Sequence, residues 1–393
     1  MHPQIEELDI TIYTKSSDVP DIVWMNITSP DNYLMQEKYL SLIEELHIDQ
    51  LKFYYAVAKL DGAIVGFAYF QENTFLGTNL IPYFPSTEDG NIFKKIRAQA
   101  LSIFKPLIGS INVPMLNTGN IFMTGEAGCF CLNRTDKDAK FELQMACIKK
   151  ICKDFPHIKA ILHADFYESD FEAAKIFRDE KFRTIAVEAD NIMEIRAEWK
   201  TFDDYLNALT SKYRVRAKKI LGLSTAVISH ELSLDDIKKH SEKITLLYNQ
   251  VTTKVDFKLA ELHKNFFARQ KEVEPERYHF VGYFYNDELI GFTSLYELQN
   301  SLEAHYFGID YSVLREFHLY QRMLYDVVRL TINLGKSQIH FGRTAPEVKT
   351  TIGAEVKPMF GYLKYLNTFV NFVMEFFTSR LQPREYILRS PFR

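Results

Sequence analysis

Apolar residues typical of β-strands, many of them aromatic or β-branched, dominate two similar stretches of the chain, residues 53–71 and 278–298. Each stretch is interrupted by a short polar turn, Asp61-Gly62 in the first and Asn286-Asp287 in the second. These residue types tolerate the positive φ angles of a tight hairpin turn. Each stretch therefore predicts a β-hairpin.

Both hairpins carry a Gly-Phe pair in their second strand. Aligning Gly66 with Gly291 brings the two stretches into register at an offset of 225 residues. A glycine within a strand usually marks a bulge or the close approach of a neighbouring group. Its recurrence at the same place predicts that the chain holds two copies of one structural unit.

The segments after each hairpin alternate between helical and extended patterns. In the first copy they predict a helix, a strand, a helix and further strands, at 138–154, 159–164, 169–180 and 182–195. In the second copy the same order is expected at 313–333, 338–341, 346–352 and 355–366. Gly335 and Gly353 follow the two helices of the second copy, as glycine commonly does at a helix C-terminus. Strands alternating with helices predict an α/β fold, in which helices flank a mixed, twisted sheet in each copy.

A helix is expected between the two copies, over residues 201–221. Thr201 is suited to its N-cap, and Asp204, three residues later, completes an imperfect capping box. No Gly/Ser-rich linker separates the copies, so we expect two domains that pack together. The predicted domains are residues 1–197 and 198–393, and the second begins with this helix.

Composition restricts the partners and the compartment. The chain has 393 residues and a net charge of -4, with 47 Lys+Arg against 51 Asp+Glu, which disfavours duplex DNA as a partner. Its four cysteines match no zinc or redox spacing and predict free thiols in a reducing compartment. The N-terminus lacks the pattern of a secretory signal, so a cytoplasmic location is expected. The apolar segment 369–377 is too short to cross a membrane; it predicts a core helix or, as the second choice, a weak contact with a membrane surface.

Two motifs carry a resemblance to a known family. They are FDDYLNALTSKYRVRAKKI at 202–220 and HFGRTAPEVKTTIGAEVKPMFGYLKY at 340–365. Together with the duplicated layout, they resemble the GNAT (Gcn5-related N-acetyltransferase) superfamily, and in particular its tandem and Fem-like members. The resemblance implies two GNAT-like units. It also implies transfer of an acyl group from an activated donor, such as acyl-CoA, to an amine acceptor.

The sequence departs from the GNAT pattern where the pyrophosphate of the donor is expected to bind. GNAT enzymes hold coenzyme A with a glycine-bearing loop at a helix N-terminus. The corresponding segments here, 131–140 and 308–317, contain no pair of glycines. Residues 124–128 (TGEAG) are rich in glycine but precede a strand, which favours an ordinary turn.

Basic residues supply the candidates for donor binding. Arg214, Arg216 and Lys218 belong to a dense basic run. Such a run is suited to the phosphates of a nucleotide, a lipid headgroup or tRNA, and the alternative is a solvated helix face. Arg343 follows a predicted strand end, where ligands bind in open α/β sheets, and the alternative is a structural ion pair. Lys349 is expected near the same cleft.

Glu297, His305 and Tyr306 are the candidates for proton transfer, on two neighbouring predicted strands. Histidine titrates near neutral pH and suits a general base, while a tyrosine hydroxyl can protonate a leaving thiolate. For each of the three the alternative is a structural hydrogen bond. His163 and Asp165 end a strand of the first copy, and for them we favour the structural role. No motif typical of a metal site is present, so no metal is expected.

These observations lead to the hypothesis of an acyltransferase that works between its two units. The acceptor is expected to be a small molecule, a peptide or a lipid, such as a precursor of the cell envelope. The first alternative is an enzyme that transfers an amino acid from aminoacyl-tRNA to a peptidoglycan-type precursor, although tRNA is the less favoured partner because no long helical arm is visible. The second alternative is a non-catalytic scaffold, which the absence of glycine pairs supports.

Overall fold

The fold comes from a computed structural model that describes most of the chain. The described residues are 8–47, 49–76, 112–125, 128–132, 137–253, 259–368, 370–371 and 386–392. The four cysteines are free thiols. No helix among the described residues is long and apolar enough to cross a membrane. The apolar segment 369–377 lies almost entirely outside these ranges.

Thirteen described strands form one sheet. They are β1 (Asp9–Tyr13), β2 (Lys52–Leu60), β3 (Ala63–Leu76), β4 (Asn112–Thr118), β5 (Cys129–Cys131), β6 (Ala160–Tyr167), β7 (Arg183–Glu194), β8 (Ile228–Glu231), β9 (Tyr278–Tyr285), β10 (Glu288–Glu297), β11 (Ser301–Ile309), β12 (Gln338–His340) and β13 (Glu355–Tyr365).

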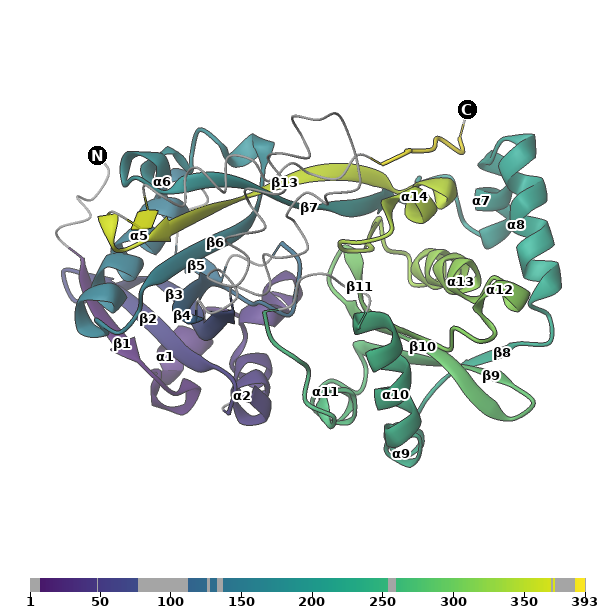
Figure 1. The fold of residues 1–393 in the computed structure, drawn as a ribbon, viewed down its shortest axis with the longest axis horizontal. Coiled ribbons are helices and arrows are strands. Elements are labelled where there is room, and N and C mark those ends of the chain that lie inside the picture. Colours follow the sequence, from purple (N-terminus) through teal and green to yellow (C-terminus); the bar gives the residue numbers. More distant parts are fainter. Residues whose placement is uncertain are drawn as a thin grey trace, which may run out of the picture.

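The helices flank this sheet, as Figure 1 shows. The α-helices are α1 (Asp21–Trp24), α2 (Glu37–His47), α5 (Lys137–Asp154), α6 (Lys175–Asp179), α7 (Phe202–Ala208), α8 (Ser211–Leu223), α9 (Leu234–Lys239), α10 (Ser241–Thr252), α11 (Phe266–Val273), α12 (Leu314–Phe317), α13 (Leu319–Asn333) and α14 (Pro346–Lys349). The 3-10 helices are η2 (Ser16–Asp18), η3 (Pro30–Met35), η5 (Glu168–Asp170) and η6 (Thr350–Ile352).

The pattern of parallel and antiparallel pairing is the same when the strands are followed from either edge of the sheet. The order is β1-β2-β3-β4-β6-β13-β7-β12-β11-β10-β9-β8, and β5 pairs with β3 beside this path. Pairing is antiparallel throughout except at β4–β6 and β11–β12, which are parallel and occupy matching places. The pairing therefore has the symmetry that the duplicated sequence pattern predicted.

The two halves exchange strands at the centre of the sheet. The last strand, β13, lies between β6 and β7, and β7 in turn pairs with β12 of the second half. In Figure 1, β7 and β13 run across the top of the molecule and join its left and right parts. One continuous sheet therefore crosses the proposed boundary between residues 197 and 198. The two domains themselves remain a prediction.

Most of the predicted elements are present, with four local differences. The single helix expected at 201–221 is divided into α7 and α8, because Leu209 between them has an extended backbone. The capping box of Thr201 and Asp204 at α7 is confirmed, and so are both hairpins. The helix expected at 169–180 is divided into η5 and α6, and the long helix at 313–333 is interrupted at His318, whose φ of 47° ends α12 before α13 begins. The strand regions at 182–195 and 355–366 are single long strands, because each pairs along both of its edges.

The two aligned glycines meet helices at the same point of each half. A Cβ atom on Gly66 would lie 2.3 Å from Leu143 Cδ2 on α5, and one on Gly291 would lie 2.3 Å from Met323 Cε on α13. Each glycine thus lets a helix pack closely against the second strand of its hairpin. The sequence indicated a close approach, and the structure identifies the approaching group.

The packing at Gly66 predicts a measurable loss of stability on substitution. In Gly66→Ala the added methyl group overlaps Leu143, so we expect the free energy of unfolding in urea to fall by about 1–3 kcal/mol. The matched control is Gly222→Ala in α8, where nothing lies within 4 Å of the new Cβ atom. Because alanine is the better helix former, this control should be neutral or slightly stabilising. Equal losses in both variants would contradict the packing argument.

Candidate active site

The two parallel strand pairs separate after only three residue pairs. In the second half, β11 and β12 pair from Ser301 and Gln338 to Glu303 and His340, after which β12 ends and β11 continues. In the first half, β4 and β6 pair over three residues in the same way, after which β4 ends and β6 continues. Ligands of open α/β sheets bind at such carboxyl ends of strands. Both openings are thus candidate sites.

Aromatic rings fill the opening of the first half. His163 is fully buried there, and its Nδ1 lies 2.6 Å from the hydroxyl of Thr118. Its ring stacks on Phe177 and Tyr362, at centroid distances of 4.6 and 6.4 Å. Burial lowers the pKa of His163 to about 3, so the ring is neutral at physiological pH. The structural role favoured for this histidine agrees with these contacts, and the second half is left as the better candidate.

An ion pair links the two halves at the centre of the sheet. Arg343 and Asp165 occupy matching positions, three residues beyond the last paired residues of β12 and β6. Their side chains form a salt bridge, and the backbone N–H of Gly125 donates a second hydrogen bond to the same carboxylate at 3.1 Å. Asp165 therefore belongs to the candidate site. The salt bridge also agrees with the structural role favoured for Asp165, and strand exchange brings it to Arg343.

The backbone around this ion pair adopts uncommon conformations. Asp165 is the extra residue of a bulge in β6 opposite Gly361, and its φ is 66°. Gly342, Thr344 and Ala345 also have positive φ, at 66°, 68° and 49°. Such conformations cost free energy in residues other than glycine and cluster at functional sites. The strain supports a ligand-binding role for this region.

A row of polar side chains crosses the sheet beside the ion pair. The hydroxyl of Tyr167 donates to Asp190 Oδ2 at 2.9 Å, and His340 Nδ1 lies 3.4 Å from the same oxygen. On the other side of the ring, His340 Nε2 lies 3.8 Å from Glu303. The row joins β6, β7, β12 and β11 at the place where the halves meet.

Contacts within this row determine the protonation states of Asp190 and His340. Burial alone would raise the pKa of Asp190, but hydrogen bonds from His340, Tyr167 and the backbone of Asn191 lower it on balance. Burial would likewise lower the pKa of His340, but the carboxylates of Asp190 and Glu303 raise it above its ordinary value. A buried carboxylate and a charged imidazole thus stabilise one another.

Lys349 holds the turn that carries Arg343. Its side chain is buried, and its ammonium group donates to the carbonyl oxygens of Phe341 at 2.8 Å, Gly342 at 3.0 Å and Arg343. Burial lowers the pKa of Lys349 to about 7. All three of its N–H groups are used within the protein, so Lys349 positions the turn that carries Arg343.

Tyr306 lies close to the site, and His305 lies beside it in an aromatic environment. Burial keeps the pKa of Tyr306 well above its ordinary value, and the charge of Arg343 opposes this shift only slightly. The Tyr306 hydroxyl donates to the Phe122 carbonyl at 3.5 Å. The ring nitrogens of His305 are shielded from solvent, and the Phe122 carbonyl faces the ring without completing a hydrogen bond. Burial lowers the pKa of His305 to about 3. The ring is therefore neutral, as a proton acceptor must be, but it is a weak base.

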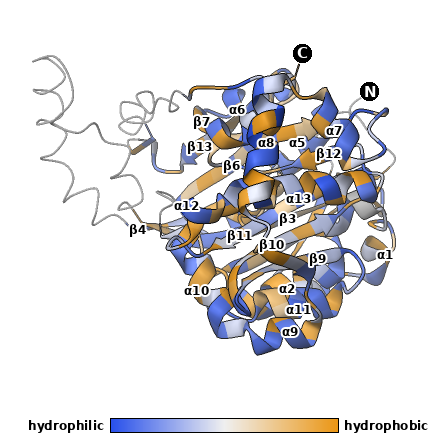
Figure 2. Ribbon diagram, turned by 90° about the vertical axis from the view of Figure 1, so that its right-hand side faces the viewer, coloured by the Kyte–Doolittle hydropathy of each residue, from blue (hydrophilic) through white to orange (hydrophobic). Residues whose placement is uncertain are grey.

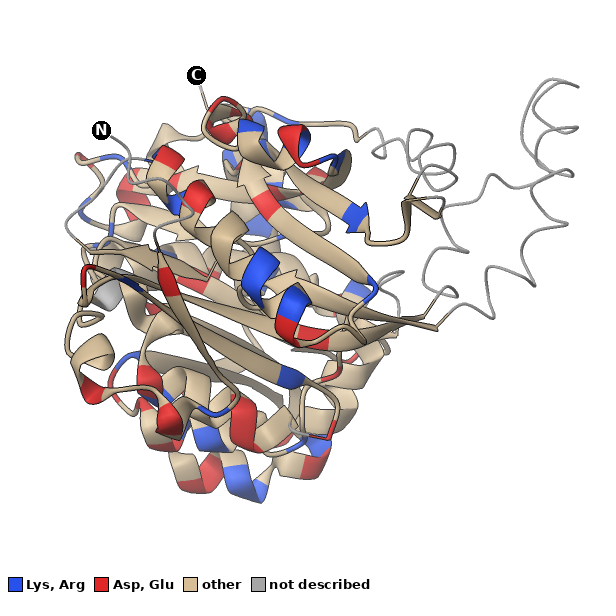
Figure 3. Cartoon of the chain, turned by 90° about the vertical axis from the view of Figure 1, so that its left-hand side faces the viewer, with Lys and Arg blue, Asp and Glu red and all other residues tan. Residues whose placement is uncertain are grey.

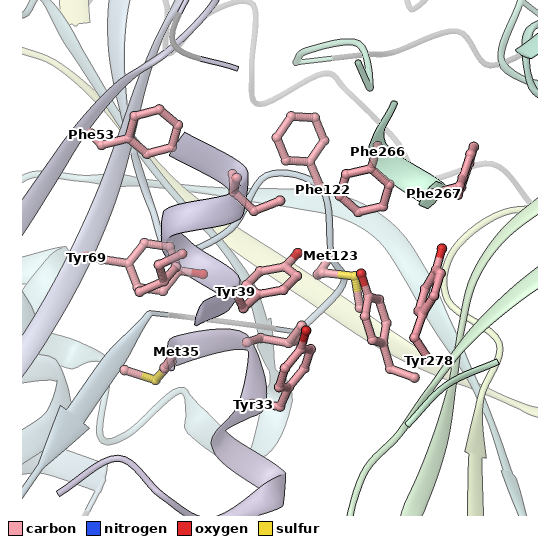
Figure 4. Packing of buried hydrophobic residues seen from close by; sticks show 14 of the residues in the cluster. Tyr33, Met35, Tyr39, Phe53, Tyr69, Phe122, Met123, Phe266, Phe267 and Tyr278 are labelled. Atoms are coloured by element: carbon pink, nitrogen blue, oxygen red, sulfur yellow. The ribbon is translucent and has the colours of Figure 1, made fainter. Parts of the chain in front are cut away.

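The same aromatic environment extends across the interface between the halves. Figure 4 shows Tyr33, Tyr39 and Phe122 of the first half close to Phe266 and Tyr278 of the second. All of them belong to one buried cluster that draws on α2, α11 and the strands β9 and β10. The interface below the sheet is thus filled by aromatic side chains. Polar contacts border these rings at α11, where Arg269 pairs with Glu45 on α2 and the side-chain amide of Gln270 donates to the hydroxyl of Tyr33.

Glu297 does not lie at this site. It forms ion pairs with Lys336 at 2.8 Å and His279 at 3.1 Å, and Lys336 precedes β12, whereas the candidate site follows it. The residue at the same 225-residue offset, Glu72, is held in the same way by His157 at 2.8 Å. An ion pair repeated in both halves at the far end of the sheet indicates a structural role. The proposed catalytic role of Glu297 therefore finds no support in the geometry.

The basic run also lies away from the site. Arg214, Arg216 and Lys218 are on α8, which forms the outer edge of the second half in Figure 1, whereas Arg343 follows the central strand β12. Arg216 and Lys218 are exposed, and Arg214 is partly buried with a hydrogen bond to the Asn207 carbonyl at 3.2 Å. These three residues and Arg343 are not brought together, so one donor molecule at the strand ends does not explain them all.

The expected donor loops do not form a phosphate cradle in the described residues. In the second half, the loop before α13 contains α12, whose Phe317 packs in an apolar cluster with Leu319 and Met323. In the first half, residues 133–136 of the loop lie outside the described ranges. Two pockets, of about 310 and 200 Å³, lie elsewhere, at Lys52 and His157 and at Tyr248 and His263. No group of three metal-ligating side chains occurs in the part of the chain that the structure describes.

The sequence did not identify Tyr167 and Asp190 as site residues. Both lie within long strands, where single polar residues read as the solvent-facing side of an alternating pattern. A signal was present in Glu188 and Asp190, two acids on one face of a strand that is otherwise apolar at its end. Only the central position of β7 makes that face a buried, polar one.

Comparisons with known proteins agree with this architecture. No protein-family model matches the chain, and no curated protein matches its sequence. The crystal structure of FemX aligns with a TM-score of 0.55 at 11% identity, covering 93% of this chain and 100% of that chain. A tandem GNAT protein from the clavulanic acid biosynthesis pathway aligns with a TM-score of 0.53 at 9% identity, covering 96% of this chain and 100% of that chain. The chain shares its fold with these two structures, and this is the fold that the resemblance of its motifs implied.

The ion pair between the halves predicts strong energetic coupling. Arg343→Gln leaves the largely buried carboxylate of Asp165 unpaired, so the free energy of unfolding should fall by about 2–4 kcal/mol. Asp165→Asn keeps a residue that tolerates positive φ, and the double variant should lose clearly less than the sum of the two single losses. Additive losses, measured in urea, would show that the pair does not join the halves.

The raised pKa of His340 predicts a specific pH dependence. Because its pKa is higher in the folded protein than the unfolded value of about 6.5, its contribution to stability is complete below that value. The contribution is lost as pH rises through the folded pKa. We therefore expect the urea midpoint to fall over this range in the wild type and to fall less in His340→Gln.

The pH experiment has an internal reference. His279, whose pKa is also raised, contributes a slope of the same sign in both proteins, so the difference between their pH profiles isolates His340. Asp190 acts in the opposite direction, since its lowered pKa makes its contribution present above its unfolded pKa and lost as pH falls through the folded one. Identical profiles above pH 6.5 would refute the assigned charge of His340.

Proposed function

We propose that this protein is an acyltransferase whose active site lies at the carboxyl end of β12, beside the ion pair of Arg343 and Asp165. The donor is an acyl-CoA or a similarly activated acyl compound, and the acceptor is an amine on a small molecule, a peptide or a lipid. The observation that carries the proposal is the fold, shared over nearly the whole chain with FemX and with a tandem GNAT protein.

The contents of the two openings support placing the reaction in the second half. Stacked rings of His163, Phe177 and Tyr362 occupy the first opening. The second opening ends in the charged pair of Arg343 and Asp165. In this proposal the guanidinium group binds an oxygen of the donor, where negative charge develops during acyl transfer.

Tyr306 and His305 are the proposed residues for proton transfer. Tyr306 has a pKa raised by burial, so its hydroxyl is protonated and able to donate to a leaving thiolate. His305 is neutral and able to accept a proton from an attacking amine. Lys349 is proposed as a positioning residue for the turn that carries Arg343.

Two alternatives follow from other observations. The likeness to FemX leaves an aminoacyl-tRNA-dependent transferase as the first alternative, in which the donor is a charged tRNA. The aromatic packing between the halves and the apolar α12 in the donor loop favour the second, a binding scaffold without catalysis. The alternatives differ in the donor that each of them binds.

A thermal-shift experiment with the full chain distinguishes them. Acetyl-CoA and longer acyl-CoAs at about 100 times Kd should raise the midpoint of unfolding by a few degrees, because such binding stabilises the folded state by about 2.7 kcal/mol. Desulfo-CoA and a non-hydrolysable aminoacyl-adenosine analogue are tested in parallel. A response to the aminoacyl analogue alone would favour the first alternative, and no response to any donor would favour the scaffold.

The matched variants are Arg343→Gln and Arg216→Gln, each of which removes one guanidinium group. The first should abolish the acyl-CoA shift, measured from its own lower starting midpoint, and the second should leave it unchanged. A shift that survives in Arg343→Gln but is lost in Arg216→Gln would move the donor site to α8 and overturn the proposed location.

A further inference from the structure

The outward face of α8 is not used by the proposed active site. The helix carries five basic residues and no acidic one, in a chain whose net charge is -4. The basic residues are Lys212, Arg214, Arg216, Lys218 and Lys219. None of them forms an ion pair with a residue that the structure describes, so their charges remain available to a partner.

The helix has two distinct faces. Ala217 and Ile220 are buried in the apolar cluster beneath it, together with α7 and α13. Lys212, Arg216 and Lys219 recur at intervals of three and four residues on the opposite, exposed face. The buried face fixes the orientation of the helix, so the basic face is held outward rather than free to turn.

Large aliphatic side chains lie exposed among the basic ones. Val215 is 67% exposed and Leu223 is 46% exposed, both on α8, and Ile228 at the start of the edge strand β8 is 66% exposed. Two more, Ile387 and Leu388, belong to the C-terminal segment. The end of that segment reaches the start of α8, because the Pro391 carbonyl accepts a hydrogen bond from the backbone N–H of Thr210, but the backbone of Ile387 donates to Glu347 on α14. Apolar and basic side chains thus share one surface.

This surface lies at one end of the molecule. Figure 2 views that end and shows α8 in front of the sheet. The opposite end, in Figure 3, has basic and acidic segments side by side. A helix with basic and exposed aliphatic residues but no acidic ones is therefore a local feature of this end and is not typical of the whole surface.

We propose that the α8 surface, defined as the outward face of α8 with Ile228, docks onto an anionic phospholipid bilayer. Basic residues near such a bilayer are attracted by its negative surface potential. Aliphatic groups on the same face enter the boundary between headgroups and acyl chains. RNA is the less suitable partner, because proteins that hold single-stranded RNA interleave exposed aromatic rings with their cations, and Tyr213, the aromatic residue of α8, is partly buried.

Co-sedimentation of the full chain with vesicles tests the proposal. Vesicles of phosphatidylglycerol and phosphatidylcholine should bind the protein at low salt and release it at high salt, and phosphatidylcholine alone should bind it far less. In the double variant Arg216→Gln/Lys219→Gln the partition coefficient should fall about 30-fold, from the loss of two surface cations. Equal binding to both kinds of vesicle, or binding to neither, would overturn the proposal.

Two further variants separate the charge and the apolar contributions. The double variant Lys238→Gln/Lys239→Gln removes the same charge from exposed positions of α9 and should bind anionic vesicles like the wild type. Val215→Ser keeps every charge but should weaken binding several-fold, because an aliphatic contact with the bilayer is lost. If Lys238→Gln/Lys239→Gln lost as much vesicle binding as Arg216→Gln/Lys219→Gln, the attraction would come from net charge and not from a defined surface.

The assay also distinguishes a bilayer from other anionic partners. Fluorescence anisotropy with labelled tRNA, and competition by inorganic pyrophosphate, are measured for the same set of variants. Tight tRNA binding that depends on Arg216 and Lys219, with no vesicle binding, would assign the surface to RNA instead. Both α8 variants should keep the acyl-CoA shift, so failure of this proposal is distinguishable from failure of the proposed enzyme function.

Discussion

The exchange of strands at the centre of the sheet is the constraint on which the rest of this structure depends. β13 lies between β6 and β7, and β7 satisfies its other edge with β12. Without β13, two long strands would present rows of unpaired backbone N–H and C=O groups, which are costly when buried and prone to wrong pairing when exposed. Each half therefore completes its sheet only in the presence of the other, and the two are expected to fold as one cooperative structure.

The polar cluster follows directly from this exchange. It places Asp165 beside Arg343, and Asp190 between Tyr167 and His340, although these residues are far apart in the sequence. Buried charges are costly unless each has a partner, so the row of alternating charges is stable only as a set. The positive φ angles around Arg343 add local strain that the surrounding sheet supports. Charge, strain and a strand opening coincide at one place, and this coincidence is the reason for proposing catalysis there.

The proposed active site and the proposed membrane-binding surface differ in the burial and pairing of their charged groups. At the strand ends, charged groups are largely buried and paired within the protein, so a donor must compete with existing contacts. On α8, four of the five cations are exposed, none of the five forms an ion pair with a described residue, and they need no rearrangement to meet an anionic bilayer. The basic run was first interpreted together with Arg343 as one donor site, and the structure separates the two. If both proposals hold, a soluble acyl donor and a membrane-bound acceptor could be handled by different parts of the second half.

The sequence by itself determined the local elements and their repetition. Asp61-Gly62 and Asn286-Asp287 specify hairpin turns, Thr201 and Asp204 specify a helix start, and Gly66 with Gly291 indicates the duplication, because each depends on conformational preferences that act over a few residues. Tertiary structure alone decided the pairing of β7 with β13, the salt bridge of Asp165, the separation of α8 from the strand ends and the ion pairs of Glu297. These depend on contacts between distant segments, which no periodicity within one segment can encode. Basic residues therefore differ in their surroundings: Lys349 is buried beneath a turn, whereas Arg216 is exposed on the surface.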